Sequence, residues 1–255
     1  MASDPKVAKQ EMKGLLRGGR LTSFDPSWFR YGERTLRPSE VVDLLRPHIS
    51  EQRLEAIDRT LANRTYNLAV VVDGMVDTGN VAAVMRSADA FGVQAFYAVD
   101  RSASYKHSKR TAQGVRKWVD RYVFRSGPEA IDVLRERGYR IVVADLSENA
   151  VPIDEVDFSP RSALVFGNEL AGVSDEFRHA ADVAAMIPMS GFAQSLNISV
   201  AAAICLHEAR RDRIARLGSH GDLNPEDVDR LRAVFAVKSV KKARAILERY
   251  LSTVS

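Results

Sequence analysis

Asn67-Leu-Ala-Val-Val-Val-Asp-Gly74 is a continuous apolar run bounded by turn-forming residues. A strand that is covered on both faces has this pattern, because neither set of its alternating side chains meets water. Short apolar runs of the same kind recur at residues 95–99, 140–145, 163–167 and 183–187. The sequence therefore predicts at least five buried strands.

Helical patterns separate most of these strands. Apolar residues recur with helical spacing at residues 81–91, 128–137, 174–180 and 195–213. Strands that alternate with helices pair in parallel through right-handed crossovers. The expected fold class is therefore an α/β sandwich built on a parallel sheet.

The two ends of the chain depart from this alternation. The first 50 residues are a mixed, basic-leaning stretch with a helix expected at 38–45, and a charged helix is expected at 52–63. We therefore predict an N-terminal extension at residues 1–50 and a core at residues 51–216.

A polar stretch at residues 218–222 indicates a linker after the core. Asn224-Pro-Glu-Asp227 then combines an N-cap residue, a proline at the first helical position and an acid three residues after the cap, which indicates a helix start. A second helix is expected after Ser239, with a basic surface on its first turns. We predict a helical C-terminal extension at residues 217–255.

Composition excludes several classes of protein. Hydrophobic residues make up 45% and charged residues 27% of the chain, which are globular values and not those of a disordered chain. No apolar run exceeds seven residues, whereas a membrane span needs about 20. The charged first residues do not resemble a secretory signal, and one cysteine cannot form an internal disulfide. We expect a soluble, cytoplasmic protein without a membrane segment or a metal site.

One segment of the chain is strongly basic. Residues 101–125 contain eight Lys or Arg residues and one acid, although the whole chain carries a net charge of only +4. Such a block favours a polyanionic partner such as a nucleic acid, because each neutralised phosphate releases condensed counterions. A solvated surface loop is the alternative explanation.

Three segments carry residues that suit a site. In the first, Asp73 to Arg86, a strand ends in a turn and a helix begins near Asn80, which places polar groups at the sheet edge where open α/β folds bind ligands. Asn80 could instead be a helix cap and Arg86 a surface cation. The Gly-x-Gly-x-x-Gly sequence of dinucleotide-binding oxidoreductases is absent, which argues against a protein of that class.

The second segment, Leu164 to Ser174, runs from an apolar strand into a polar pair flanked by Gly167 and Gly172. The glycines allow a sharp turn and close approach to a ligand, and Glu169 offers a hydrogen-bond acceptor. A simple tight turn before a helix capped by Ser174 is the alternative.

The third segment, Ile187 to Ala209, is a strand end and a glycine loop that feed a helix with a small, apolar body. Such a helix is expected to be buried, with Ser195 and Asn197 displayed at its entrance. Cys205 lies in the apolar body and is expected to serve packing and not catalysis.

Together these three segments, in this order and spacing, resemble the SPOUT methyltransferases, and within them the TrmH-like group that methylates ribose 2′-hydroxyls of RNA. The matching residues are Asn80 with Arg86, Phe166-Gly-Asn-Glu169 with Gly172 and Ser174, Ile187-Pro-Met189, and Ser195-Leu-Asn197. The resemblance covers about residues 52–213. It implies a deep trefoil knot in the C-terminal part of the core, an obligate homodimer, and S-adenosylmethionine bound in the knot.

The resemblance also implies roles for individual residues. Gly167, Ile187, Met189 and Leu196 are expected to hold the cofactor. The expected catalytic residues are Asn80, Arg86, Glu169, Ser195 and Asn197. The candidates for holding RNA backbone are Arg110, Arg116, Lys117, Arg211 and Arg213.

The expected activity is methylation of a tRNA at guanosine 18 of the D-loop. Methylation of 23S rRNA by the same chemistry is an alternative, because Val76-Asp-Thr-Gly79 stands where close tRNA relatives typically carry a Lys-Pro-His stretch. A non-catalytic RNA-binding or assembly protein with this fold is a third possibility, but it would be expected to lose the arginine or the Ser-Leu-Asn entrance. Both are present.

Overall fold

The computed structural model describes residues 29–31, 34–74, 78–101, 117–168 and 171–253. These residues form two units, one made of residues 66–219 and the other of residues 29–65 together with 220–253. We call them the core unit and the terminal unit.

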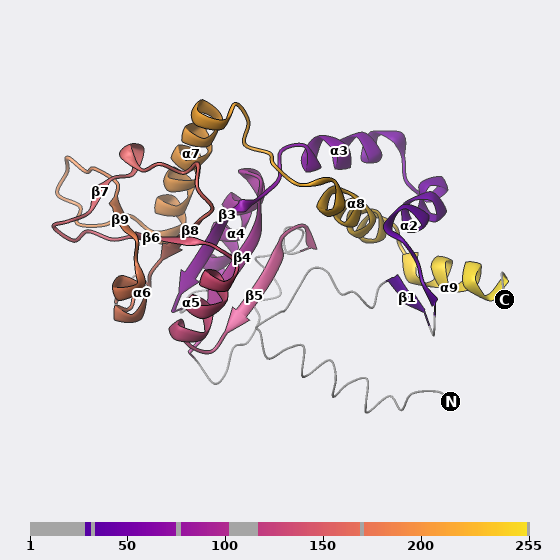
Figure 1. The fold of residues 1–255 in the computed structure, drawn as a ribbon, viewed down its shortest axis with the longest axis horizontal. Helices are drawn as coiled ribbons and strands as arrows, with labels where there is room; N and C mark the ends of the chain where they lie inside the picture. Colours follow the sequence, from indigo (N-terminus) through magenta and orange to yellow (C-terminus); the bar gives the residue numbers. More distant parts are fainter. Residues whose placement is uncertain (1–28, 32–33, 75–77, 102–116, 169–170, 254–255) are drawn as a thin grey trace. The chain divides into compact units, whose positions relative to one another are not determined.

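A parallel sheet of seven strands forms the centre of the core unit (Figure 1). Its strand order is β5-β4-β3-β8-β6-β9-β7, and the pairings β3–β8, β4–β5, β6–β8, β6–β9 and β7–β9 are all parallel. The strands are β3 (Thr65–Asp73), β4 (Val93–Val99), β5 (Asp120–Phe124), β6 (Arg140–Ala144), β7 (Val151–Pro152), β8 (Ser162–Phe166) and β9 (Val183–Met186). The predicted parallel α/β sheet is confirmed.

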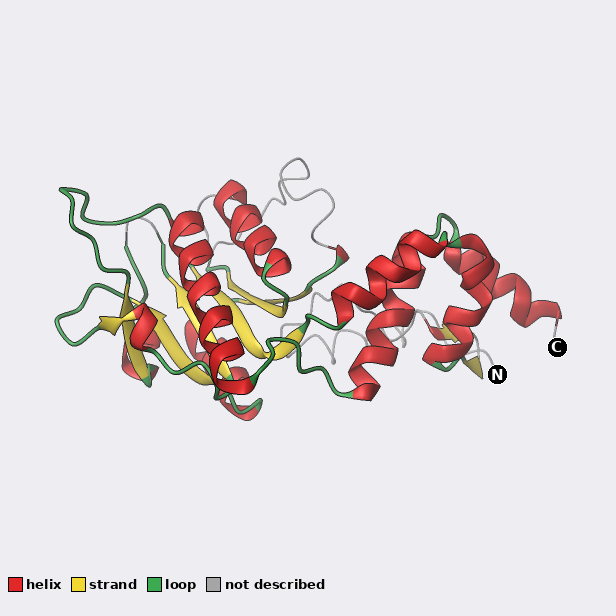
Figure 2. Ribbon diagram, turned by 90° about the horizontal axis from the view of Figure 1, so that it is seen from above, coloured by secondary structure: helices red, strands yellow, loops and turns green. Residues whose placement is uncertain are grey.

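Helices cover both faces of this sheet (Figure 2). They are α4 (Thr78–Ala90), α5 (Gly127–Glu136), α6 (Asp175–Ala180) and α7 (Ile198–Leu217), with a short 3₁₀ turn, η5 (Ile153–Glu155). Along β3, Leu68, Val70 and Val72 pack in one cluster with α4 and α7. Ala69 and Val71 pack on the opposite face with α5 and α6. Burial on both sides explains why the run at residues 67–74 is apolar without alternation.

Two strands of this sheet were not predicted. β5 alternates buried and half-buried residues, and its first residue, Asp120, is a buried acid that accepts a hydrogen bond from the Tyr66 hydroxyl at 2.5 Å. A polar start of this kind hides a strand from a search for apolar runs. β7 has only two residues, which is too short for any periodic signal.

The terminal unit contains four helices, labelled in Figure 1: α2 (Pro38–Leu45), α3 (Glu51–Leu61), α8 (Pro225–Ser239) and α9 (Ala243–Thr253). A short hairpin of β1 (Arg30–Tyr31) and β2 (Arg34–Thr35) and a 3₁₀ turn, η3 (Arg46–His48), complete its described elements. Helix α8 packs against α2 and α3, and α9 packs against α2. The buried side chains that join them include Val41, Leu45, Leu231 and Leu247.

This pairing corrects the predicted boundaries. The two ends of the chain form one unit instead of two separate extensions, and α3 belongs to that unit although the sequence analysis assigned residues 51–65 to the core. The backbones meet closely at Gly221, where an added Cβ would lie 2.0 Å from the Ala62 carbonyl oxygen. Asp222 N–H also donates to the Arg64 carbonyl at 3.1 Å. Local patterns cannot reveal such a contact between distant segments.

Within the described ranges, the helices are too short or too polar to cross a membrane. The same residues contain no group of three or more His, Cys, Asp or Glu side chains placed to hold a metal ion.

Candidate active site

A cleft of about 340 Å³ lies at the carboxyl ends of three neighbouring strands, β8, β6 and β9. Gly167 follows β8 and Ile187 follows β9, and both line the cleft together with Met189, Ser195, Leu196 and Asn197. All four predicted cofactor residues and two predicted catalytic residues therefore share one cavity. The remaining lining residues are Ala144, Asp145, Leu146, Phe166, Asn168, Gly172, Val173, Ala185, Met186, Ile198, Ala201 and Cys205.

The glycine turn forms one wall of the cleft. Asn168 and Gly172 exchange two backbone hydrogen bonds, at 2.9 and 2.8 Å, so the chain doubles back on itself directly after β8. A Cβ at Gly167 would lie 2.1 Å from the Gly172 carbonyl carbon, and Gly172 has a φ of +69°. Both positions therefore require glycine. Glu169 lies outside the described residues.

Asn168 connects this turn to the neighbouring strand, β3. Its side-chain amide donates to the Gly74 carbonyl at 3.0 Å, and its side-chain oxygen accepts from Ala171 N–H at 3.1 Å. Sequence reasoning placed Asn168 in the motif but assigned it no role. Its position between a strand end and a glycine turn was the available signal, because a short amide side chain can satisfy the backbone at such a turn.

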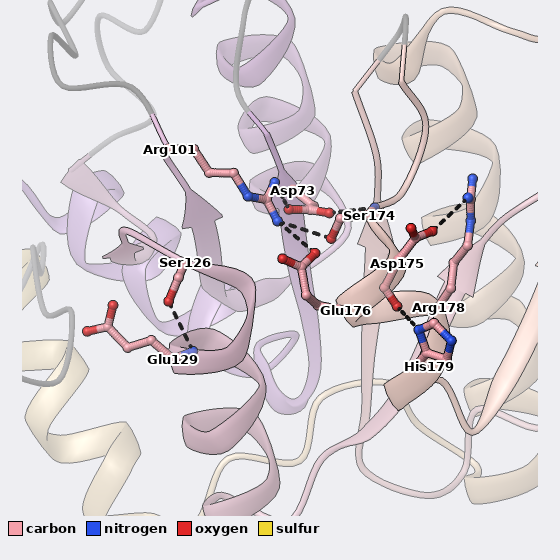
Figure 3. Close-up of polar contacts among 9 residues, drawn as sticks. All are labelled: Asp73, Arg101, Ser126, Glu129, Ser174, Asp175, Glu176, Arg178 and His179. Carbon is pink, nitrogen blue, oxygen red and sulfur yellow. Dashed lines mark hydrogen bonds and ion pairs between the residues drawn. The ribbon is translucent and has the colours of Figure 1, made fainter.

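A second polar group, shown in Figure 3, also joins the strand ends. The buried Asp73 accepts hydrogen bonds from Arg101 Nη1 at 2.7 Å and from Ser174 N–H at 2.8 Å. Arg101 Nη2 donates to the Ser174 hydroxyl at 3.1 Å and to Glu176 at 3.4 Å. The Ser174 hydroxyl bond, a backbone hydrogen bond and the Arg101 charge hold the pKa of Glu176 below its usual value. This network attaches the start of α6 to the ends of β3 and β4.

The entrance of α7 lies beside the start of α4. Asn197 is the N-cap of α7, and its side-chain oxygen accepts from the Ser199 N–H at 2.9 Å and the Ser199 hydroxyl at 2.6 Å. The Asn197 side-chain amide donates to the Asn80 side-chain oxygen at 3.4 Å. Two predicted catalytic residues from distant motifs are therefore neighbours.

Comparison with known proteins agrees with this geometry. The model of the SpoU rRNA Methylase family matches residues 67–207, which is more than half of the chain.

The chain belongs to the SpoU rRNA methylase family.

Relatives with named activities extend the comparison. A tRNA (guanosine(18)-2′-O)-methyltransferase from Thermus thermophilus is 38% identical over 178 residues, covering 69% of this chain and 92% of that protein. The 23S rRNA (guanosine-2′-O-)-methyltransferase RlmB from Acinetobacter baylyi is 35% identical over 179 residues, covering 68% of this chain and 71% of that protein.

Two solved structures resemble this fold. The A. aeolicus TrmH/SpoU tRNA modifying enzyme has a TM-score of 0.67 and 35% identity, and the match covers 75% of this chain and 98% of that chain. The SpoU methyltransferase AviRb from Streptomyces viridochromogenes, crystallised with the cofactor AdoMet, has a TM-score of 0.54 and 28% identity, covering 62% and 64% of the two chains.

Arg86, the other predicted catalytic residue of the first segment, is exposed on α4. It follows Asn80 by six residues, which is about 9 Å along a helix axis. Within the described chain, the residues that line the cleft do not include Arg86. Arg86 is therefore a surface residue of α4 in the described structure.

The predicted RNA-contacting residues lie in different environments in the structure. Lys117 is exposed, with its ammonium 4.5 Å from the centre of the Trp118 ring, and Arg211 is exposed and paired with Glu208 at 2.7 Å. The prediction for Arg213 was wrong, because this side chain is fully buried and donates to the Phe158 carbonyl at 3.0 Å. Its position on the buried face of α7 makes it a structural residue. Arg110 and Arg116 lie outside the described residues.

Cys205 lies on the same helix and lines the cleft, but its thiol is buried. Burial raises the pKa of this thiol to about 12. The thiol is therefore protonated at neutral pH and a poor nucleophile. This agrees with the expected packing role.

Proposed function

We propose that this chain is an S-adenosylmethionine-dependent RNA ribose 2′-O-methyltransferase that acts on tRNA at guanosine 18 of the D-loop. The observation that carries the proposal is the meeting of the glycine turn and the Ser195-Leu-Asn197 entrance in one cleft of a SpoU-family chain. The identity to a tRNA (guanosine(18)-2′-O)-methyltransferase over most of that relative's length supports the choice of substrate.

S-adenosylmethionine fits the cleft in size and chemistry. The volume of about 340 Å³ lies at the lower end of the range of small-molecule sites, which is about 300 to 1,000 Å³. Apolar side chains such as Phe166 and Leu196 suit an adenine ring, and a few polar groups can orient the rest. We assign binding of the cofactor to Gly167, Ile187, Met189 and Leu196. When bound, it supplies a methyl group on a positively charged sulfur.

The ribose 2′-hydroxyl is a weak acid, so the enzyme must assist the loss of its proton. Methyl transfer would join the ribose oxygen to the methyl carbon, break the carbon–sulfur bond to release S-adenosylhomocysteine, and pass the hydroxyl proton to water. Because a guanidinium stays protonated in proteins, Arg86 cannot be a simple base. We assign it to stabilising the developing negative charge on the ribose oxygen while it holds a neighbouring phosphate. Asn80, Glu169, Ser195 and Asn197 are assigned to positioning and hydrogen bonding around this oxygen.

We further propose that the chain after β9 passes through the deep trefoil knot of this family. The path supports this, because β9 lies beyond β6 while the following residues return to line the same cleft as Gly167. Helix α7 then packs against α4.

A homodimer is proposed because large apolar side chains of the core unit are exposed. Leu146 is 57% exposed, Phe192 is fully exposed and Val200 is 46% exposed. Apolar surface of this kind is often covered by a second chain. Sedimentation velocity on the purified chain measures the oligomeric state directly.

We assign contacts with the RNA backbone to Lys117 and Arg211, together with Arg110 and Arg116. Lys117 and Arg211 are exposed cations, and such groups can neutralise phosphates and release counterions. A tRNA substrate would place the reaction in the cytoplasm.

A labelling experiment tests the function. The purified protein is incubated with radiolabelled S-adenosylmethionine and an unmodified tRNA transcript, and the product is mapped. We expect label at guanosine 18 and none in a matched transcript with 2′-deoxyguanosine at that position, because the acceptor hydroxyl is missing. Ribosomal RNA is assayed in parallel, since the RlmB relative favours 23S rRNA as the second candidate. Label confined to ribosomal RNA would replace the first assignment with the second.

A further inference from the structure

Asp145 lines the cleft at the end of its central strand. It directly follows β6, which lies between β8 and β9 in the sheet. Ala144 is paired in register with Ala185 of β9, and Asp145 N–H donates to the Ala185 carbonyl at 3.0 Å. The Asp145 backbone is therefore held between the glycine turn after β8 and the loop after β9, which are the two segments assigned to the cofactor.

The charge of Asp145 is unusual for this cavity. Among the cleft-lining residues of the described chain, it alone has a carboxylate or a cationic group. Its side chain is only 18% exposed. Burying a charge in apolar surroundings is unfavourable unless hydrogen bonds or an opposite charge compensate for the lost water.

The protein compensates this charge incompletely. Arg178 Nε lies 3.5 Å from Asp145 Oδ2, which is beyond a good hydrogen bond, and Arg178 also pairs with the exposed Asp175 at 3.4 Å. Arg178 stands on α6 (Figure 3) and its Nη2 would lie 3.1 Å from a Cβ at Gly172, so its guanidinium lies beside the glycine turn. A carboxylate can accept about four hydrogen bonds. Among the described residues, this long ion pair is the side-chain contact of the Asp145 carboxylate, and it leaves most of this capacity to a ligand.

We propose that Asp145 is a cofactor-binding residue whose carboxylate accepts hydrogen bonds from a donor group of S-adenosylmethionine, either the ribose hydroxyls or the methionyl ammonium. The proposal rests on the proposed function, which supplies the ligand. Both donor groups have the chemistry that an ionised, mostly buried acceptor at a strand end requires. Acids at the ends of strands in other open α/β folds hold ribose hydroxyls in this way.

Isothermal titration calorimetry tests the proposal without a turnover assay. S-adenosylmethionine is titrated into the wild-type protein and into the near-isosteric variant Asp145→Asn. We expect the Kd to rise about tenfold or more, as for the loss of one charge-assisted hydrogen bond. The matched control is Arg178→Gln, which removes the cation but keeps the carboxylate, and we expect its Kd to change by less than about threefold. A loss in Arg178→Gln equal to that in Asp145→Asn would overturn the proposal, because Asp145 would then act only by holding Arg178.

A second ligand, 5′-methylthioadenosine, separates the two donor groups because it keeps the ribose and lacks the ammonium. Weaker binding of both ligands to Asp145→Asn assigns the ribose hydroxyls, and weaker binding of S-adenosylmethionine alone assigns the ammonium. If both ligands bound Asp145→Asn as tightly as the wild-type protein, the role of Asp145 would be overturned, and the proposed function would not be affected. Failure of the wild-type protein to bind S-adenosylmethionine would overturn the proposed function and this inference with it.

Thermal melting is a second readout for the same variants. A ligand that binds only the folded state raises the melting temperature. S-adenosylmethionine should raise the Tm of the wild-type protein more than that of Asp145→Asn. Equal shifts would contradict the role of the carboxylate, even if the variant is less stable by itself.

Discussion

The cleft and the exposed face of α4 consist of different kinds of residues. The cleft consists of strand ends, a glycine turn and apolar side chains, held by backbone hydrogen bonds and by Asn168. The α4 face presents Arg86 to solvent, and it connects to the cleft through Asn80 and Asn197. The proposed function divides the work between these two regions, with the cofactor assigned to the cleft and the acceptor ribose assigned to α4. Substitutions on the two sides should therefore have separable effects.

The largest effect is expected for Arg86→Ala. Removing the guanidinium should lower kcat by about 100-fold or more, as for the loss of a group that stabilises transition-state charge. The Kd for S-adenosylmethionine should stay within about twofold, because the residue does not line the cleft. Single-turnover methylation and calorimetry measure the two quantities. If the Arg86→Ala protein had wild-type activity, Arg86 would not take part in methyl transfer, and the proposed difference between α4 and the cleft would be wrong.

Gly167→Ala, a substitution in the cleft, should have the next largest effect, and this effect should be on cofactor binding. The added Cβ would lie 2.1 Å from the Gly172 carbonyl carbon, so the turn must open. We expect the Kd for S-adenosylmethionine to rise at least about tenfold, with a loss of folding stability of about 1–3 kcal/mol, as for other overpacked sites. Gly191→Ala is the matched control, because no atom lies within 4 Å of a Cβ there. Equal losses of cofactor binding in both variants would show that tight packing of the turn is not the cause.

The smallest effect is expected outside both regions, in the basic segment. Replacing Arg116 and Lys117 together by alanine should weaken RNA binding several-fold and reduce the slope of log K against log salt concentration, because fewer counterions are released. Cofactor affinity should not change. Filter binding across a salt series measures the slope. An unchanged slope would assign these charges to solvated surface.

Local patterns in the sequence predicted much of the core unit. The apolar runs at residues 67–74 and 163–167 became β3 and β8. These predictions succeeded because burial on both faces of a parallel strand leaves a pattern within a few residues. β5 escaped detection because the buried Asp120 interrupts such a pattern and is compensated by Tyr66, far along the chain.

The site was predicted less completely. The glycine turn and the Ser-Leu-Asn entrance were found because both carry special backbone or capping residues next to a strand end. Asp145 and the Asp73–Arg101–Ser174 contacts were not found, because a lone charged residue in a sequence does not indicate its partners. Arg213 was misassigned for the same reason, since a buried arginine and an exposed one look alike in a sequence.

The amino-acid sequence by itself determined the alternation of strands and helices, the positions where only glycine is tolerated, and the motifs of the family, because these depend on short-range sterics and burial. Only the tertiary structure decided which strand ends meet in the cleft, that the two ends of the chain pack into one unit, and which charged side chains face the cavity, the solvent or the interior. Those outcomes depend on contacts between residues far apart in the chain, and such contacts leave no periodic pattern.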